Sequence, residues 1–234
     1  MKTVLLLFIF LSSLAHALEF KGKAYDQEKG QLIYIEKHKT VDDANGFNQL
    51  IETQYTDPDG KVMATIQSDF KKDLVIPDVI FVDSRFGFKD EQIYDPDTKI
   101  VKITRTNDKT GKIEKNEFKV KKNMLGGQGF NNFLVKNFDQ LLDKKSIPVQ
   151  FIVLSSRDFF EFKIQLSGNT KLEPDQVEFG LSISSYFLKV FVNDIQTIYS
   201  KTSKRLLTFR GLSNLSNDKG KPYNVRIEYE YPTK

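Results

Sequence analysis

The chain has 234 residues, with 35 Lys and Arg against 31 Asp and Glu, and it contains no cysteine. The lack of cysteine excludes disulfide bonds, thiol nucleophiles and thiolate metal sites. The formal net charge is +4, and basic and acidic residues are interleaved along the chain. This interleaving is typical of a solvated surface rather than of a basic face for DNA or RNA, so no nucleic-acid partner is expected.

The first seventeen residues have the composition of a secretory signal peptide. Lys2 gives a basic start, residues 4–11 form an unbroken apolar run, and Ala15-His16-Ala17 places small residues where a signal peptidase reads them. Polar sequence follows at once, which makes a retained membrane anchor the less favoured alternative. The sequence predicts cleavage after Ala17, a mature chain without a transmembrane segment, and a periplasmic or secreted location.

After this segment, apolar and polar residues alternate with a period of two, the pattern of strands with one buried face. Turn sequences at 57–60, 95–98, 107–111 and 217–220 carry Asp, Asn, Pro or Gly where tight turns require them. Turns at this spacing favour an antiparallel meander without parallel βαβ units. Strands are predicted over 31–39, 47–56, 62–70, 92–94, 100–105, 113–121, 149–154, 159–166, 177–184, 186–192, 205–211 and 223–231.

One segment has the period of a helix instead. Six apolar residues from Phe130 to Leu142 recur at intervals of three and four, so that they share one helical face. The polar residues between them, including Asn131 and Asn132, fall mostly on the opposite face. A proline shortly afterwards ends the helix, because the residue before proline resists helical geometry. The glycine-rich residues 126–129 are interpreted as a flexible hinge ahead of the helix.

Together these elements predict a mainly β (α+β) fold. We expect residues 18–234 to form a single β-rich domain, an antiparallel curved sheet or half-barrel of about eleven strands with one central amphipathic helix packed on its concave face. The helix could also divide two sheets, which leaves a two-lobed arrangement open. The protein is expected to be a monomer.

Few residues offer catalytic or metal chemistry. His38 is the only histidine after cleavage, and among Glu36, Lys37 and Lys39 it is interpreted as an exposed polar residue. A lone histidine makes no His-based metal site, and no serine stands in a nucleophile elbow. Asp-Pro-Asp at 57–59 and at 95–97 is explained by turn formation rather than by calcium binding. The sequence therefore predicts no enzyme activity, no metal and no cofactor.

Phenylalanine is abundant, with 20 residues in the chain, and several cluster near the predicted helix. A curved sheet closed by a Phe-rich helix could leave an apolar cavity for a lipid, whereas the alternative is that these rings fill an ordinary core. Under the cavity hypothesis, the helix faces the concave side and strand residues border the remaining space. The predicted ligand-binding residues are Phe130, Phe133, Leu134, Phe138, Leu141, Phe160, Phe162 and Phe209.

Export, an antiparallel meander, a Phe-bearing helix in mid-chain and a late strand-turn-strand at 205–214 resemble periplasmic proteins of the LolA/LolB-like superfamily. The resemblance implies an unclosed β-barrel covered by helices that carries the acyl chains of a lipoprotein. It therefore implies a lipid or a lipid-modified protein as the partner. The alternative function is an envelope structural or protein-interaction domain with a filled core, and an enzyme is the least favoured reading.

Overall fold

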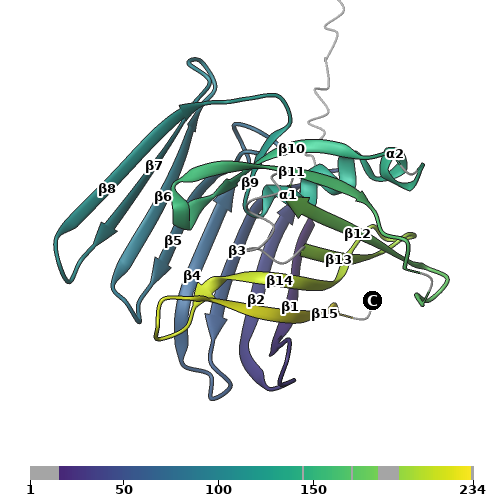
Figure 1. Cartoon of the computed structure of the whole chain (residues 1–234), viewed down its shortest axis with the longest axis horizontal. Coiled ribbons are helices and arrows are strands. Elements are labelled where there is room, and N and C mark those ends of the chain that lie inside the picture. The colour runs from purple at the N-terminus through teal and green to yellow at the C-terminus, as the bar shows by residue number, and fades with distance from the viewer. Residues whose placement is uncertain (1–15, 144, 170, 184–194, 233–234) are drawn as a thin grey trace, which may run out of the picture.

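The computed structural model describes residues 16–143, 145–169, 171–183 and 195–232, which form one open, curved sheet of 15 strands with short helices on its concave side (Figure 1). The strands are β1 (His16–Asp26), β2 (Leu32–Asp42), β3 (Asn48–Thr56), β4 (Val62–Asp69), β5 (Asp78–Asp83), β6 (Phe88–Asp95), β7 (Ile100–Asn107), β8 (Lys112–Lys119), β9 (Met124–Gly126), β10 (Ile147–Val153), β11 (Asp158–Leu166), β12 (Gln176–Ile183), β13 (Ile195–Ser200), β14 (Leu206–Ser216) and β15 (Pro222–Glu230).

The strands follow one another across the sheet in two runs. From β8 at one edge the order descends to β1, and from β15, the other neighbour of β1, it descends to β9 at the second edge. The pairing of β1 with β15, from Lys21 opposite Glu230 to Asp26 opposite Val225, joins the first and last parts of the described chain. The predicted antiparallel, mainly β half-barrel is confirmed.

The strand count and boundaries differ from the prediction. The sheet has 15 strands, where the alternation pattern led us to expect about eleven. The strands β1, β5, β9 and β13 were not predicted, and the strand predicted over 186–192 lies outside the described residues. In β5 the outward-facing Ile80 and Val82 are exposed and apolar, so the sequence there lacks the alternation that marks a half-buried strand.

The segment predicted to be removed by signal peptidase overlaps β1 by two residues. His16 and Ala17 pair with Asp42 and Val41, where we expected residues 1–17 to lie outside the fold. Residues 1–15 lie outside the described residues, and cleavage after Ala17 stays a prediction. Cleavage there would remove the first two pairs of β1 and leave its other pairs in place.

Aspartate and asparagine side chains close the hairpin turns. The Oδ1 of Asp57 accepts the backbone N–H of Asp59 at 3.1 Å and of Lys61 at 2.8 Å, and Gly60 takes a φ of +90°. These bonds offer the backbone an alternative to the sheet ladder and so terminate β3. The same arrangement closes the turns that begin at Asp26, Asp43, Asp95, Asn107 and Asn217. The predicted turns at 57–60 and 95–98 are confirmed.

The single predicted helix is divided into α1 (Gly129–Lys136) and α2 (Phe138–Leu142). At the break, the side chain of Asn137 donates to the carbonyl oxygen of Phe133 at 2.8 Å, alongside its own backbone N–H at 3.1 Å. A side chain that bonds to the preceding turn in this way competes with helix propagation. The apolar face nevertheless continues across the break, since Phe133, Leu134, Phe138 and Leu141 are all buried.

The two helices connect β9 to β10, which pair in parallel, with Met124 opposite Gln150 and Gly126 opposite Ile152. The prediction that no parallel βαβ unit exists is therefore wrong. The helices carry the chain back across the sheet, so that it re-enters in its original direction. A strand of three residues is too short for a period of two to reveal it.

The buried apolar side chains form three clusters. The helix cluster consists of the buried residues Leu125, Phe133, Leu134, Phe138, Leu141, Ile147, Val149, Phe162, Ile164, Val177, Phe179, Leu181, Ile183 and Tyr199. The sheet cluster consists of Ala24, Tyr34, Tyr55, Met63, Ala64, Ile66, Val79, Phe81, Leu215, Val225 and Ile227. A third, edge cluster consists of Ile76, Tyr94, Val101, Ile103, Met124 and Ile152.

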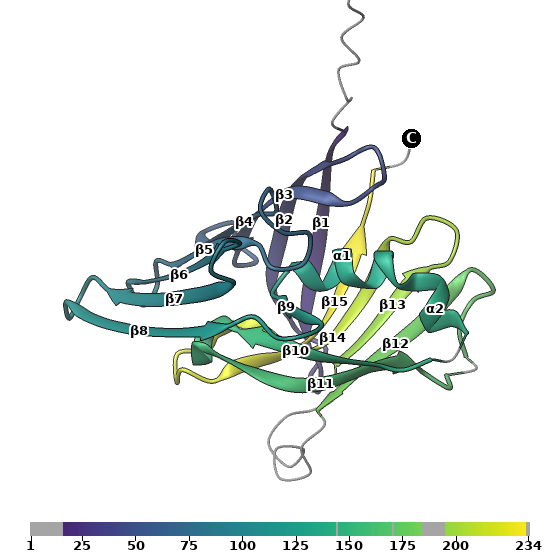
Figure 2. The same ribbon diagram turned by 90° about the horizontal axis from the view of Figure 1, so that it is seen from above.

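The two ends of the sheet approach one another at the tip of the β10–β11 hairpin, where a short 3-10 helix spans Leu154–Ser156. The ring of Phe159 meets Phe118 of β8 edge-on, with centroids 4.9 Å apart. Arg157 forms an ion pair with Glu114 at 3.1 Å, and its carbonyl oxygen accepts from the side chain of Asn116 at 2.9 Å. Figure 2 shows β8 extending toward β10 and β11, so the β8 edge of the half-barrel lies close to the β10–β11 hairpin.

Gly129 is a site of close packing rather than part of a free hinge. A Cβ there would lie 2.7 Å from the carbonyl carbon of Val75 and still closer to its oxygen. We predict that Gly129→Ala costs about 1–3 kcal/mol of unfolding free energy, because the backbone segments must move apart. Gly180→Ala is the matched control, since nothing lies within 4 Å of a Cβ at that position. Urea denaturation measures both, and equal stabilities of the two variants would contradict the prediction.

Candidate functional site

The helix α1 is held to the sheet by its polar face as well as by its apolar face. Asn132 is fully buried: its Oδ1 accepts the backbone N–H of Asn48, and its Nδ2 donates to the carbonyl oxygens of Asn48 and Leu74, each at 2.9 Å. Asn131 bonds to the side chains of Asn48 and Tyr199, each at 3.1 Å. The interpretation of these asparagines as facing away from the apolar contacts was incomplete, because the start of β3 and the loop after β4 contact that side of the helix.

A chain of buried polar side chains runs across the concave face and ends at the start of α1. Gln128, directly before α1, accepts from Ser68 of β4 at 2.8 Å and donates to the hydroxyl of Thr53 of β3 at 3.0 Å. That hydroxyl lies 2.8 Å from Nδ1 of His38 on β2, and Nε2 of His38 lies 2.9 Å from the carboxylate of Glu36. These bonds connect three neighbouring strands to the N-terminal end of the helix.

The same carboxylate is shared with the last strand of the sheet. Tyr229 of β15 donates its hydroxyl to Oε2 of Glu36 at 3.2 Å. A Cβ at Gly22 of β1 would lie 3.1 Å from that oxygen and 2.9 Å from atoms of Tyr229 and Ile227, so only glycine lets these side chains close over β1. The polar chain is thus built into the sheet from β4 to β15.

The interpretation of His38 as an exposed residue is wrong. Its side chain is 8 % exposed, and its ring stacks on Phe20 with centroids 4.5 Å apart. Alternation along β2 explains the difference, because Lys37 and Lys39 point to the other face and are exposed there. A sequence signal was present, since Tyr34, Glu36, His38 and Thr40 share one face of this strand.

The order Thr53, His38, Glu36 has the connectivity of a nucleophile, a base and an orienting acid. Thr53 is only 2 % exposed, however, and its hydroxyl already bonds to Gln128. A nucleophile must reach a substrate carbonyl beside oxyanion donors, and this buried hydroxyl does not present itself in that way. The contacts of this polar chain instead support a role in positioning α1.

Burial shapes the electrostatics around Glu36. Burial, reinforced by the charge of Glu36, raises the pKa of Tyr34 and of Tyr55, and both rings are at most 2 % exposed. The pKa of the Tyr229 hydroxyl is also raised, again first by burial and next by Glu36. These phenols therefore stay neutral, and that of Tyr229 donates its hydrogen bond to Glu36.

The predicted ligand-binding residues divide into three groups. Phe133, Leu134, Phe138, Leu141 and Phe162 are buried members of the helix cluster. Phe130 and Phe160 pack against that cluster and stay partly exposed. Phe209 does not belong with the others: it is partly exposed and packs against the sheet cluster, where β14 places it opposite Ile227.

Inward-facing aromatic residues that stay partly exposed occur on two walls of the concave side. On the first wall, Phe130 of α1 contacts Phe151 of β10 with centroids 6.1 Å apart, and Phe151 stands opposite Phe160 of β11. On the second wall lie Phe209 of β14 and Tyr229 of β15. Leu154, at the tip of the β10–β11 hairpin, packs against the sheet cluster, which brings the first wall toward the second.

Two arginines near this side form ion pairs with buried aspartates. Asp83, 1 % exposed, receives both Nε and Nη2 of Arg85 at 3.0 and 2.6 Å. Asp90, also 1 % exposed, receives the corresponding atoms of Arg105 at 2.6 and 2.5 Å. Such two-point pairs fix both side chains and leave little net charge for an anion.

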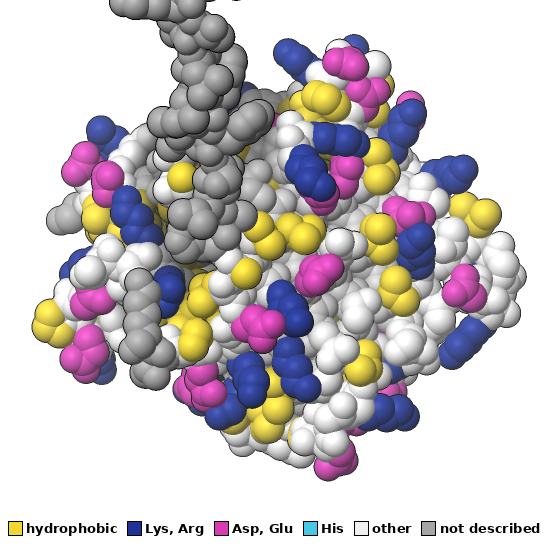
Figure 3. Space-filling view, turned by 180° about the vertical axis from the view of Figure 1, so that it is seen from behind, with side chains coloured by type: hydrophobic (Ala, Val, Ile, Leu, Met, Phe, Trp, Pro, Cys, Tyr) yellow, Lys and Arg dark blue, Asp and Glu magenta, His cyan; other side chains and the backbone are white. Residues whose placement is uncertain are grey.

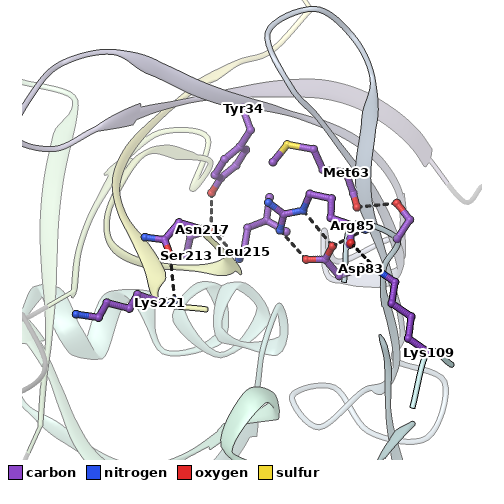
Figure 4. A network of polar contacts seen from close by, with 10 residues as sticks. Tyr34, Met63, Asp83, Arg85, Lys109, Ser213, Leu215, Asn217 and Lys221 are labelled. Atoms are coloured by element: carbon purple, nitrogen blue, oxygen red, sulfur yellow. Dashed lines mark hydrogen bonds and ion pairs between the residues drawn. The ribbon is translucent and has the colours of Figure 1, made fainter. Parts of the chain in front are cut away.

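Figure 4 shows Arg85 and Tyr34 converging on the β14–β15 hairpin, which carries Ser213 and Leu215. Tyr34 and Ser213 are joined by a hydrogen bond of 2.7 Å, and the same Ser213 hydroxyl accepts the backbone N–H of Leu215 at 3.0 Å. The side chain of Lys109 bonds to the carbonyl oxygen of Arg85 at 3.0 Å. This end of the concave side is therefore tied together by polar contacts from several strands.

Two open depressions border the helices. The larger, of about 520 Å³, is lined mainly by polar residues from Lys122 to Glu161 and includes Phe133. The smaller, of about 310 Å³, is lined by residues between Leu142 and Lys201. Of the eight predicted ligand-binding residues, Phe133 alone lines either depression.

The outer surface carries charges of both signs. Figure 3 shows basic and acidic side chains mixed across one face, with apolar side chains scattered between them. Among the residues with described positions, no three His, Asp or Glu side chains are arranged to hold a metal ion. The helices of the described chain are all too short or too polar to cross a bilayer.

No family model and no curated protein matches the sequence. A similar solved structure is the beta-barrel-like protein of a domain of unknown function, DUF1849, from Brucella abortus, with a TM-score of 0.42 and 9 % sequence identity. The match covers 93 % of this chain and 95 % of that chain. With so distant a likeness, any function must be argued from the residues of this chain itself.

Proposed function

We propose that this is an exported protein of the cell envelope that binds an apolar ligand, such as a lipid or the acyl chain of a lipoprotein, on the concave side of its half-barrel. The observation that carries the proposal is the set of inward-facing aromatic side chains that stay partly exposed on two walls of the concave side: Phe130, Phe151, Phe160, Phe209 and Tyr229. The mode of binding would resemble that of LolA/LolB-like carriers.

Physical chemistry supports this assignment over a purely structural one. A large aromatic ring that faces inward but keeps contact with solvent forgoes part of its burial free energy, which a bound apolar chain would restore. The neighbouring arginines are paired with aspartates, so the surface offers an apolar contact rather than a site for an anion. The proposal assigns no catalytic role and no cofactor.

The alternative is an envelope domain with a filled core, and the complete burial of Leu134 and Leu141 favours it. These two residues, with Phe133, Phe138 and Phe162, have their contact surface already occupied by the helix cluster. We therefore assign ligand contact to the partly exposed rings and a packing role to the buried ones. Both functions predict the same orientation of the helices, so only the presence or absence of a bound ligand distinguishes the two functions.

The test is binding of the uncharged probe N-phenyl-1-naphthylamine, whose fluorescence rises in an apolar site. The wild-type protein is expected to bind it at micromolar concentration, and Phe160→Ala to weaken binding at least about tenfold, because one aromatic contact is lost. Ile93→Ala is the control, since Ile93 is 44 % exposed and lies on the outer face of β6, away from the concave side. Circular dichroism verifies that each variant is folded.

Three results would contradict the carrier function. These are absence of probe binding to the wild-type protein, equal binding by Phe160→Ala, and equal weakening by Ile93→Ala. Native mass spectrometry of the purified mature protein would identify a lipid that co-purifies with it. N-terminal sequencing of exported protein tests the location separately: Leu18 is expected as the first residue, and a protein that begins at Met1 would exclude cleavage.

A further inference from the structure

The polar chain through His38 has a definite direction. An ionised carboxylate only accepts hydrogen bonds. Nε2 of His38 therefore carries a hydrogen and donates it to the carboxylate of Glu36, 2.9 Å away. Nδ1 is then an acceptor, and Thr53 donates to it at 2.8 Å. Thr53 in turn accepts from the amide of Gln128, whose oxygen accepts from Ser68. Each of these hydroxyl and amide groups has one consistent role when the imidazole is neutral.

A second proton on His38 breaks this order. Nδ1 then donates to Thr53, so His38 and Gln128 both point N–H groups at one hydroxyl, whose own hydrogen has lost its acceptor. The amide of Gln128 can turn over to accept that hydrogen, but its NH₂ group then faces Ser68. Ser68 is fully buried, and its hydroxyl hydrogen is now the one without a partner. Either arrangement leaves one buried donor unpaired.

We propose that the contact between Gln128 and the sheet is a proton-sensitive latch on the N-terminal end of α1, controlled by His38. Withdrawal of Gln128 admits water to the hydroxyls of Thr53 and Ser68, and this water relieves the conflict by completing their hydrogen bonds. Gln128 is the member of this polar chain that can move away most easily. It lies in the loop before α1 and is partly exposed, whereas Thr53 and Ser68 lie in the sheet.

Few titratable groups face His38. The titratable groups that face it are Glu36 on β2 and Tyr229 on β15, while β1 presents Phe20 and β3 presents Thr53. The nearest lysines in sequence alternate to the exposed face of β2. Histidine is the side chain that ordinarily changes charge between about pH 5 and 8. A second proton on His38 therefore loosens the latch.

Loosening stays local. Asn132 keeps its three bonds to the sheet, and the helix cluster keeps Phe133 and Leu134 buried. The expected change is confined to residues 126–131, where the N–H groups of Phe130 and Asn131 bond to the carbonyl oxygens of Gly127 and Gln128. This end of α1 adjoins Phe130, one of the partly exposed rings, but the latch is measured without ligand and so stands or falls independently of the proposed function.

The experiment is hydrogen exchange of the ligand-free protein at about pH 7.5 and 5.5, corrected for the intrinsic rate. In the wild type, the protection of residues 128–131 is expected to fall about tenfold more than that of β12 on acidification, which corresponds to about 1.4 kcal/mol. His38→Gln keeps one donor and one acceptor but does not titrate, so its protection should not change with pH. Unchanged wild-type protection, or the same fall in His38→Gln, would overturn the proposal.

Gln128→Ala provides a second variant that leaves the buried pair intact. Without the amide, residues 128–131 are expected to show the low protection of the acidified wild type at both pH values. A response to pH equal to that of the wild type would show that Gln128 is not the latch. This variant decides the question even if His38→Gln does not fold.

Discussion

Raising the pH above about 10 is expected to unfold this protein steeply, because its core contains tyrosine hydroxyls that the folded state keeps neutral. Tyr34, Tyr55 and Tyr199 are at most 2 % exposed, and burial is the first cause that raises the pKa of each. Below the unfolded-state pKa both states hold these protons, so the stability is fully present. Above it the unfolded chain ionises and the folded chain does not, so stability is lost as the pH rises.

The size of the effect follows from the number of groups. Each buried tyrosine contributes about 1.4 kcal/mol per pH unit between its unfolded and folded pKa, so these three together contribute about 4 kcal/mol per unit. A domain with 5–15 kcal/mol of stability, the usual range, would then unfold within about one to four pH units. Circular dichroism and the part of the tyrosinate absorbance near 295 nm that comes from these three buried residues should change together, in one cooperative step.

Single substitutions separate this cause from general alkaline damage. Tyr199→Phe should lower the slope of stability against pH by about 1.4 kcal/mol per pH unit, because one ionisable group leaves the core. Phe138→Leu is the control: its ring lies 6.2 Å from that of Tyr199, and its loss should lower stability at every pH without changing the slope. A slope of stability against pH that is the same in Tyr199→Phe as in the wild type would contradict the prediction.

The strands illustrate what alternation can predict. Turns closed by Asp57 and Asp95 mark strand ends through local chemistry, and the strands that flank them alternate clearly. The strand β1 was missed because its inward positions include Gly22 and Ala24, which carry little apolar signal although both are buried. The strand β9 is too short for any period. Pairing between β1 and β15 depends on residues two hundred positions apart, which local patterns do not encode.

The candidate site illustrates a different limit. Periodicity placed Phe133, Leu134, Phe138 and Leu141 correctly on one buried face. It did not predict that these residues would be fully packed while Phe151 and Tyr229 stay partly exposed, because exposure depends on which other strands cover each ring. Sequence neighbours made His38 look solvated, whereas its environment is set by Phe20 and Thr53 from adjacent strands.

Replacing Asn132 is expected to be among the most destabilising single changes in the protein. A polar residue on the solvent face of a helix would gain from substitution by alanine, by about 0.5 kcal/mol from helix propensity. Asn132 is instead fully buried, and it satisfies one N–H and two carbonyl groups of the strand and loop that flank α1. Asn132→Ala leaves all three without that partner, at an expected cost of about 3–4 kcal/mol.

The sign of this change in stability shows whether the polar face of α1 is anchored to the sheet. If α1 contacted the sheet through its apolar face only, Asn132→Ala would make the protein more stable. Lys136→Ala is the matched control on the same helix: Lys136 is exposed, and its loss should change stability by less than about 0.5 kcal/mol. Asn132→Asp should be at least as harmful as Asn132→Ala, because it keeps the acceptor for Asn48, loses both donated bonds and buries a charge. Urea denaturation of the three variants measures these costs, and an Asn132→Ala protein as stable as the wild type would mean that the polar face of α1 does not anchor it.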